Sequence, residues 1–137
     1  MIQRPRRNRL NPAIRGLARE TLVSPGNLVW PAFVQEGKNL RTPIVSMPDI
    51  SRLSIDELVK DCQEAYDLGI PAVALFPVLE NSLKNPKGKE SLNPNGLLQR
   101  AVRELKRTIP GMVVITDVAL DPYSCDGHDG LVKDGKI

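Results

Sequence analysis

Long apolar runs, cysteines, histidines and aromatic residues are all scarce in this 137-residue sequence. No stretch approaches the roughly 18 consecutive apolar residues that a membrane-spanning helix needs, so we expect no membrane span. The only two cysteines, Cys62 and Cys125, lie far apart and do not make a disulfide framework, so a reducing cytoplasm is the expected compartment. No aromatic residue lies between the basic residues near the N-terminus, which disfavours base stacking on a nucleic acid there.

The charge of the chain is unevenly distributed. Of its 19 basic and 16 acidic side chains, six arginines and Glu20 fall in residues 1–20, which leaves 13 basic and 15 acidic side chains and a net charge of −2 for the rest. We therefore predict a basic N-terminal arm with a short helix over residues 1–24 and a folded body over residues 25–137. From the residues alone, such an arm is either a nucleic-acid-binding tail or a protein–protein contact whose arginines meet interface carboxylates.

Two segments show the apolar periodicity of long helices. In residues 54–68, apolar side chains recur every three or four positions, Ser54 and Glu57 match the S-x-x-E capping box, and Gly69 is the expected stop. Cys62 lies on the apolar face, which predicts a small core residue. Residues 97–109 form the second predicted helix, with an apolar face made of Leu97, Leu98, Ala101, Val102 and Leu105.

Three short apolar runs, at residues 28–34, 72–76 and 112–116, predict buried strands. Pro31 within the first run indicates a strand start or an irregular edge. Because these strands alternate with helices, the chain is predicted to form right-handed βαβ units and a parallel sheet.

The remaining segments are predicted to be arm and connections. Residues 1–10 show no apolar period and are predicted to be extended, and a short helix follows with Asn11 as its N-cap and Pro12 as its first residue. Residues 35–53 and 80–96 are polar and contain proline, which predicts loops.

Polar chemistry is concentrated in residues 116–130, T-D-V-A-L-D-P-Y-S-C-D-G-H-D-G, which we call the acidic loop. Acids crowded after a buried strand repel one another unless a cation, a basic group or a proton offsets them, and α/β folds place active sites at the carboxyl ends of strands. Asp and Gly are also ordinary turn formers, so the residue types alone leave a solvated loop equally open. The candidates are Asp117, Asp121, Asp126, Asp129, Cys125 and His128.

The acidic loop closely resembles the metal-site loop of the porphobilinogen synthase family, also called 5-aminolevulinate dehydratase. Further segments resemble the family in the same order: R-P-R-R at 4–7, L-V-W-P-A-F-V at 28–34, E-G at 36–37, S-M-P at 46–48 with Arg52 after it, residues 61–68 with Gly69, and N-G at 95–96. This resemblance spans the whole chain. It implies an α/β fold that is the N-terminal part of a (β/α)₈ TIM barrel, comprising the arm and the first three strands.

The resemblance also implies a reaction. The family condenses two molecules of 5-aminolevulinate into porphobilinogen with loss of two waters, in heme and chlorophyll biosynthesis, through lysines that form Schiff bases on later barrel strands. A complete barrel needs about 250 residues, and the lysines of this chain all fall in predicted loops or on helix faces. We therefore expect an N-terminal fragment that is inactive alone. A truncated inactive product and a nucleic-acid-binding module are the alternatives.

The resemblance extends to individual residues of the acidic loop. Asp117 matches the family's strand-end aspartate that lines the substrate pocket, where it would orient the substrate amine or transfer a proton. Zinc-using members hold the metal with three cysteines, and the matching positions here are Ala119, Asp121 and Asp129. The chain thus resembles the aspartate-rich variant, in which Asp121 and Asp129 either are metal ligands or replace the metal with their own charge.

The expected ion and partners follow from these residues. Carboxylates suit hard cations such as Mg²⁺, whereas zinc favours thiolate and imidazole and a structural zinc site needs four ligands, so Cys125 and His128 are too few. We expect His128 to stabilise the loop through a hydrogen bond. In the family, the arm wraps a neighbouring subunit in dimers that build octamers, so we expect a homo-oligomer and disfavour nucleic acid as the partner.

Overall fold

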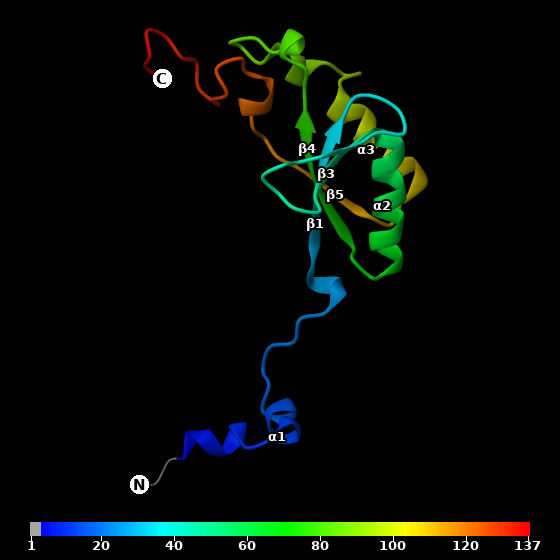
Figure 1. Cartoon of the computed structure of the whole chain (residues 1–137), viewed down its shortest axis with the longest axis vertical. Coiled ribbons are helices and arrows are strands. Elements are labelled where there is room, and N and C mark those ends of the chain that lie inside the picture. The colour runs from blue at the N-terminus through cyan, green and yellow to red at the C-terminus, as the bar shows by residue number, and fades with distance from the viewer. Residues whose placement is uncertain (1–3) are drawn as a thin grey trace.

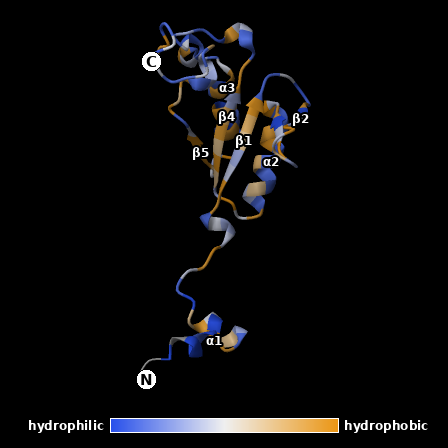
Figure 2. Cartoon of the chain, turned by 60° about the vertical axis from the view of Figure 1, so that its left-hand side comes forward, coloured by the Kyte–Doolittle hydropathy of each residue, from blue (hydrophilic) through white to orange (hydrophobic). Residues whose placement is uncertain are grey.

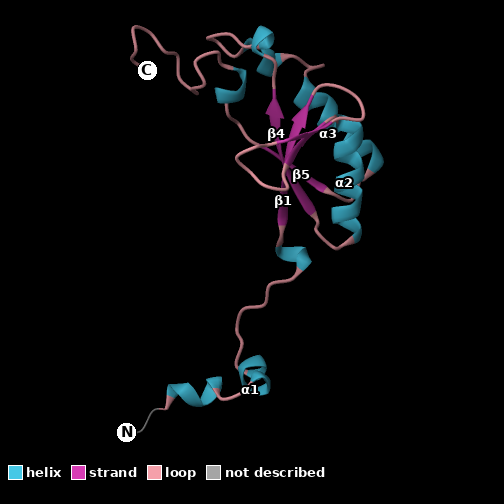
Figure 3. Cartoon of the chain, viewed as in Figure 1, coloured by secondary structure: helices cyan, strands magenta, loops and turns pink. Residues whose placement is uncertain are grey.

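The computed structural model describes residues 4–137 as a five-stranded sheet with two long helices on one face and an arm that runs away from it (Figures 1 and 3). The strand order is β2-β3-β1-β4-β5. β1, β4 and β5 are parallel, β3 runs parallel to β1 along its other edge, and β2 pairs antiparallel with β3. The bounds are β1 Val29–Gln35, β2 Arg41–Pro43, β3 Ser51–Leu53, β4 Ala72–Val78 and β5 Val113–Thr116. The three predicted strands and their parallel pairing are thus confirmed.

Alternation of side chains along the strands gives the sheet two unequal faces. The face toward the helices is buried at Ala32 and Val34 of β1 and at Val73 and Leu75 of β4. On the opposite face, Phe33 and Phe76 lie directly across from each other with their ring centroids 5.8 Å apart, yet both remain only half-buried. The described residues therefore cover one face of the sheet and leave the other open.

Helices α2 (Ile55–Asp67) and α3 (Leu97–Thr108) cover the buried face, as predicted. Full burial of one leucine contributes about 2 kcal/mol, so the packed apolar faces stabilise this layer more than helix propensity does. Figure 2 shows that the strands are mainly hydrophobic, whereas the loops at their carboxyl ends are mainly hydrophilic. Helix residues fully buried in this core are Leu58, Cys62, Leu97, Ala101 and Leu105.

The start of α2 differs from the prediction. Ser54 is the N-cap residue, but its side chain caps no amide of the helix; it donates to Asp56 Oδ1 at 2.6 Å and accepts from the N–H of Leu40 at 3.0 Å. Glu57 pairs with Arg41 and Lys60 instead of reaching back to Ser54. The predicted capping box is therefore wrong, because residues outside the first turn compete for both side chains.

The end of α2 is as predicted. Gly69 has φ +89°, in the left-handed region where a side chain would be strained, and its N–H donates to the carbonyl of Tyr66. The following N–H, of Ile70, donates to the carbonyl of Ala65. This arrangement ends the helix and directs the chain into β4.

The connection at residues 35–53 contains two short strands, so the loop predicted there is wrong, whereas residues 80–96 contain neither a strand nor an α-helix and the loop predicted there is confirmed. Residues 35–53 hold β2 and β3, and β3 pairs with the end of β1 through Phe33 with Arg52 and Val34 with Leu53. Strands of three residues are too short for a period-2 pattern to be visible in the sequence. Residues 80–96 include the 3₁₀ turns Asn81–Leu83 and Lys89–Leu92.

Pro31 lies inside β1, where it is paired with Ala74 of β4. The pairing of β1 with β3 involves only Phe33 and Val34, so Pro31 sits where β1 has β4 as its partner on one side alone. A missing N–H is tolerated at such a position. The predicted strand start or irregular edge is nevertheless wrong, because β1 pairs with β4 in regular register from Val29 to Gln35.

The arm contains more helix than predicted. Residues Pro5–Arg9 form a 3₁₀ helix with proline at its start, so the extended structure expected there is wrong, and residues 1–3 lie outside the described part of the chain. Helix α1 (Pro12–Leu17) is confirmed, with Asn11 accepting from the N–H of Ile14 at 3.0 Å. Figure 1 shows the arm leading away from the sheet; the division into residues 1–24 and 25–137 stays a prediction.

Across the described residues 4–137, no helix is both long enough and apolar enough to cross a bilayer.

Candidate functional site

The acidic loop begins at the carboxyl end of β5, and Asp117 is the first residue after that strand. Strand β5 pairs in parallel with β4, so the loop starts beside the carboxyl end of β4. There it borders a pocket of about 170 Å³. The pocket is lined by Leu75, Phe76 and Pro77 of β4, Leu98 of α3, and Asp117, Ala119, Asp121, Pro122 and Tyr123 of the loop.

Tyr123 anchors the loop to the body. Its side chain is buried together with that of Ser124, and burial raises the pKa of the Tyr123 hydroxyl. The carbonyl of Tyr123 accepts from the N–H of Asn85 at 3.2 Å, which ties the loop to the segment before α3. The 3₁₀ turn Asp121–Tyr123, with Pro122 in its first turn, places these residues at the pocket. The anchoring role of Tyr123 was not predicted, although a tyrosine beside proline in a polar loop is a signal for it.

The carboxylate of Asp129 folds the loop back on itself. Its Oδ1 accepts from the N–H of Leu120 at 2.6 Å and from the N–H of Asp121 at 3.0 Å. These amides hold the pKa of Asp129 below its ordinary value. His128 Nδ1 accepts from the N–H of Gly130 at 3.0 Å, so the predicted loop-stabilising hydrogen bond of His128 is confirmed.

The acidic loop, residues 116–130, does not gather the ligands of a complete metal site. Within residues 4–137, no three or more His, Cys, Asp or Glu side chains are grouped so that they could hold a metal ion. Asp121 lines the pocket, whereas Asp129 is engaged with backbone amides and does not line it. The described residues thus do not form a complete metal site, and Mg²⁺ at Asp121 and Asp129 stays a prediction. Cys125 is exposed and also lies outside the pocket lining.

The structure places no lysine in a strand of the described chain, in agreement with the expectation from the sequence. Seven of the eight lysines are exposed, and Lys84 is half-buried in the segment before α3. A buried strand position would desolvate the amine and lower its pKa, as a Schiff-base nucleophile requires. Within this chain the pocket therefore offers carboxylates but no lysine amine.

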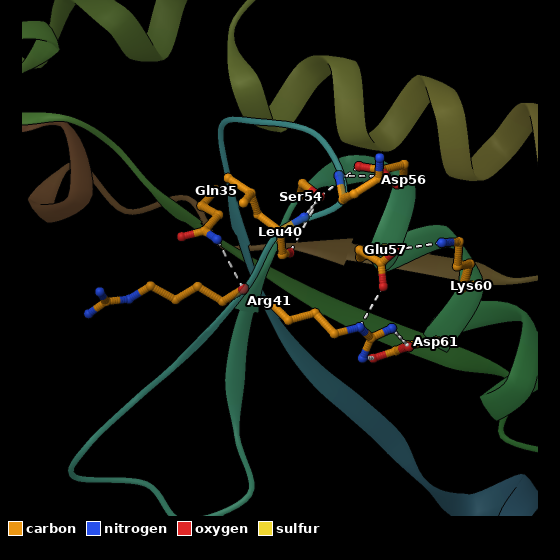
Figure 4. Close-up of polar contacts among 10 residues, drawn as sticks. Gln35, Leu40, Arg41, Ser54, Asp56, Glu57, Lys60 and Asp61 are labelled. Carbon is orange, nitrogen blue, oxygen red and sulfur yellow. Dashed lines mark hydrogen bonds and ion pairs between the residues drawn. The ribbon is translucent and has the colours of Figure 1, made fainter.

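A second group of polar side chains, which the sequence analysis missed, lies where β2 meets the start of α2; we call it the β2–α2 corner (Figure 4). Arg41 of β2 binds Glu57, and its Nη1 donates to Asp61 Oδ2 at 2.9 Å. Lys60 binds the other oxygen of Glu57. These bonds, with Lys60 first and Arg41 second, hold the pKa of Glu57 below its ordinary value.

Two further hydrogen bonds extend the corner. The N–H of Asn39 donates to Asp56 Oδ2 at 2.8 Å, and Gln35 Nε2 donates to Thr42 Oγ1 at 2.8 Å. Hydrogen bonds from Ser54 and Asn39 hold the pKa of Asp56 low. The acids at positions 56, 57 and 61 share one side of the helix, a pattern that indicates a basic partner outside it. The corner fixes β2 and β3 against α2 and leaves its acids paired.

Comparison with known proteins identifies the family of the chain. The family model described as delta-aminolevulinic acid dehydratase matches residues 2–137. A delta-aminolevulinic acid dehydratase of Bradyrhizobium diazoefficiens is 46% identical over 134 residues, covering 98% of this chain and 38% of the relative. The chloroplastic enzyme of Glycine max is 49% identical over 136 residues, covering 98% of this chain and 33% of the relative. The chain thus spans about a third of the length of the curated relatives it matches.

A solved structure shows the same fold. The crystal structure of delta-aminolevulinic acid dehydratase (porphobilinogen synthase) from Toxoplasma gondii ME49, in complex with the reaction product porphobilinogen, superimposes with a TM-score of 0.92 at 48% identity. The superposition covers 98% of the present chain and 38% of the Toxoplasma gondii chain. The predicted fold class, the N-terminal part of a TIM barrel, is confirmed by this match. By its family-model match and its identity to these relatives, the chain belongs to the delta-aminolevulinic acid dehydratase family.

Proposed function

We propose that this chain forms one wall of a porphobilinogen synthase active site, in which two molecules of 5-aminolevulinate condense to porphobilinogen with loss of two waters. The observation that carries the proposal is the position of Asp117. It follows β5 directly, lines the pocket at the carboxyl ends of β4 and β5, and lies within the segment that matches the family. Parallel α/β folds place catalytic groups at this end of their strands.

Asp117 is suited to binding an amine. Its side chain is exposed at the pocket, and no lysine or arginine within residues 4–137 forms an ion pair with it. An unpaired carboxylate attracts the ammonium group of 5-aminolevulinate or exchanges a proton with it. Phe76 and Pro77 supply an apolar wall beside it. The chain alone is proposed to be inactive, because no lysine amine lines the pocket.

The arm is proposed to form a contact in a homo-oligomer, up to the octamer implied by the family resemblance. Its apolar side chains are strongly exposed, with Leu10 at 77%, Leu17 at 89% and Leu22 at 72%. Apolar residues among arginines favour a protein surface over a polyanion, which attracts charge alone. We also propose a cytoplasmic location, although the Glycine max relative is named chloroplastic.

Mg²⁺ is the proposed ion of the acidic loop, but the described residues supply only part of its ligands. Mg²⁺ prefers octahedral oxygen coordination, and the two carboxylates of Asp121 and Asp129 do not complete it. Any Mg²⁺ site would draw further ligands from water or from residues outside this chain. Zinc is disfavoured because no thiolate lines the pocket.

A chimera tests the proposed function. Residues 1–137 replace the matching segment of the Bradyrhizobium diazoefficiens relative, and porphobilinogen formation is measured colorimetrically. We expect the chimera to form porphobilinogen, and purified residues 1–137 to form none above background. A chimera that folds and assembles like the parent relative but forms no porphobilinogen would contradict the proposal.

A further inference from the structure

Asp129 acts on the pocket from outside it. Its side chain is exposed and does not line the pocket. The two amides that it binds, of Leu120 and Asp121, lie between the pocket residues Ala119 and Pro122. The carboxylate therefore holds the backbone segment that carries one wall of the pocket. We call these two hydrogen bonds the Asp129 clasp.

The clasp joins residues that are eight and nine positions apart in the sequence. Hydrogen bonds to an ionised carboxylate are stronger than neutral ones, and here two of them converge on one oxygen. With both donors directed at Oδ1, that oxygen has little capacity left for a cation, which leaves Oδ2 as the one carboxylate oxygen of Asp129 without a hydrogen bond from the described residues. The absence of any group of three metal-binding side chains within the described residues agrees with this arrangement.

Asp126 provides a natural contrast in the same loop. Its carboxylate is exposed like that of Asp129, but it accepts no hydrogen bond from the described residues, and only its backbone N–H is bonded, to Ser124 Oγ at 3.2 Å. Position in the loop and charge are therefore similar for the two residues. Only Asp129 connects distant parts of the loop.

We propose that Asp129 is a positioning residue that fixes the backbone at Leu120 and Asp121, and thereby the pocket wall, rather than a metal ligand. Its consequence for catalysis rests on the proposed function, whereas the clasp itself rests on the hydrogen bonds alone. The oxygen acceptor is what the role requires. An asparagine at this position keeps the acceptor and loses the charge, while an alanine loses both.

The test uses the chimera described above with Asp129→Asn, Asp129→Ala and the matched control Asp126→Asn. Hydrogen–deuterium exchange reports on the amides of Leu120 and Asp121, and kinetics report kcat and KM with and without EDTA. We expect Asp129→Ala to speed exchange of these amides and to lower kcat/KM, each about 10-fold or more. Asp129→Asn keeps most of the protection and the activity, and Asp126→Asn changes neither.

Two results would overturn the inference. In one, Asp129→Asn and Asp129→Ala lose activity equally, and both raise the Mg²⁺ concentration that the EDTA-treated chimera needs for half of its activity; Asp129 is then a metal ligand. In the other, Asp129→Ala leaves amide exchange unchanged. If Asp129→Ala fails to fold, Asp129→Asn alone tests the inference. Loss of both activity and exchange protection of the Leu120 and Asp121 amides in Asp129→Asn would contradict the role of the acceptor. An inactive unsubstituted chimera refutes the proposed function, and exchange still decides on the clasp.

Discussion

The β2–α2 corner and the acidic loop both contain several carboxylates, but the two regions differ in whether basic side chains bind these carboxylates. In the corner, Glu57 and Asp61 are bound by Arg41 and Lys60, and Glu57 is almost fully buried. In the acidic loop, no lysine or arginine of the described residues forms an ion pair with any of the four aspartates. Paired acids join elements of the fold, whereas unpaired acids at a pocket remain available to a ligand.

The comparison explains why composition alone does not identify a site. Both regions hold several acids within a short span of sequence, and the sequence shows neither their partners nor their exposure. Pairing in the corner depends on β2, whose position beside α2 is fixed by its antiparallel pairing with β3. If the comparison is right, substitutions in the corner change stability, and substitutions at the pocket change activity.

Removal of the Asp117 carboxylate is expected to have the largest effect. In the chimera, Asp117→Ala should lower kcat/KM for porphobilinogen formation by about 100-fold or more, the usual range for losing a group that transfers a proton or binds developing charge. The melting temperature should stay within a degree or so, because Asp117 is exposed and bonded to no described side chain. Activity and melting temperature are measured on the same preparation. Equal activity of the variant and the chimera would contradict the role of Asp117.

Loss of Arg41 is expected to lower stability rather than activity, unlike loss of the Asp117 carboxylate. Arg41→Ala leaves Asp61 without its partner and Glu57 with Lys60 alone, which should destabilise the chimera by about 1 kcal/mol by urea denaturation. The control is Arg107→Ala, which removes a more exposed pair with Glu104 on α3 and should destabilise the chimera less than Arg41→Ala does. A 100-fold loss of activity in Arg41→Ala without a loss of stability would contradict the stabilising role of the β2–α2 corner.

The stability that the β2–α2 corner contributes should also depend on pH. The pKa of Glu57 lies below its ordinary value of 4.5, so its contribution to stability is present above that pH and is lost as the pH falls through the lower, folded-state pKa. Glu57→Gln should therefore be less stable than the parent at neutral pH, and the difference should shrink as the pH falls below the ordinary value of 4.5. Urea midpoints above and below this pH measure the difference. A difference that does not change with pH would show that the charge of Glu57 contributes nothing.

The smallest effect is expected at Asp126. Asp126→Asn should change both the free energy of unfolding and kcat/KM only within measurement error, by less than about 0.5 kcal/mol. Its carboxylate meets no bonding partner within the described residues. A large effect on activity would place Asp126 in the active site and extend the functional part of the loop.

Much of the fold could be predicted because its signals are local. Gly69 ends α2 through its own backbone, and the apolar faces of both helices are visible as a period in the sequence. β2 and β3 could not be predicted, since each has three residues and their pairing depends on distant β1. Ser54 and Glu57 matched a local capping pattern and were drawn instead to Leu40 and Arg41, which are distant in sequence.

The site could be predicted only in part. Asp117 and Asp121 are at the pocket, as their place after a strand suggested. The use of Asp129 was not foreseen, because residue type does not show whether a carboxylate faces a cation or a backbone amide. The apolar wall from β4 was missed as well, since Phe76 and Pro77 resemble ordinary strand residues in the sequence.

The most direct test of the central claim is a crystal structure of the chimera with porphobilinogen bound. We expect the Asp117 carboxylate to lie within hydrogen-bond distance, about 3 Å, of a nitrogen of the product or of a water bound to it. We also expect Glu57 and Asp61 to remain paired with Arg41. Product bound elsewhere, with no contact to any residue of the acidic loop, would contradict the claim that this chain forms a wall of the active site.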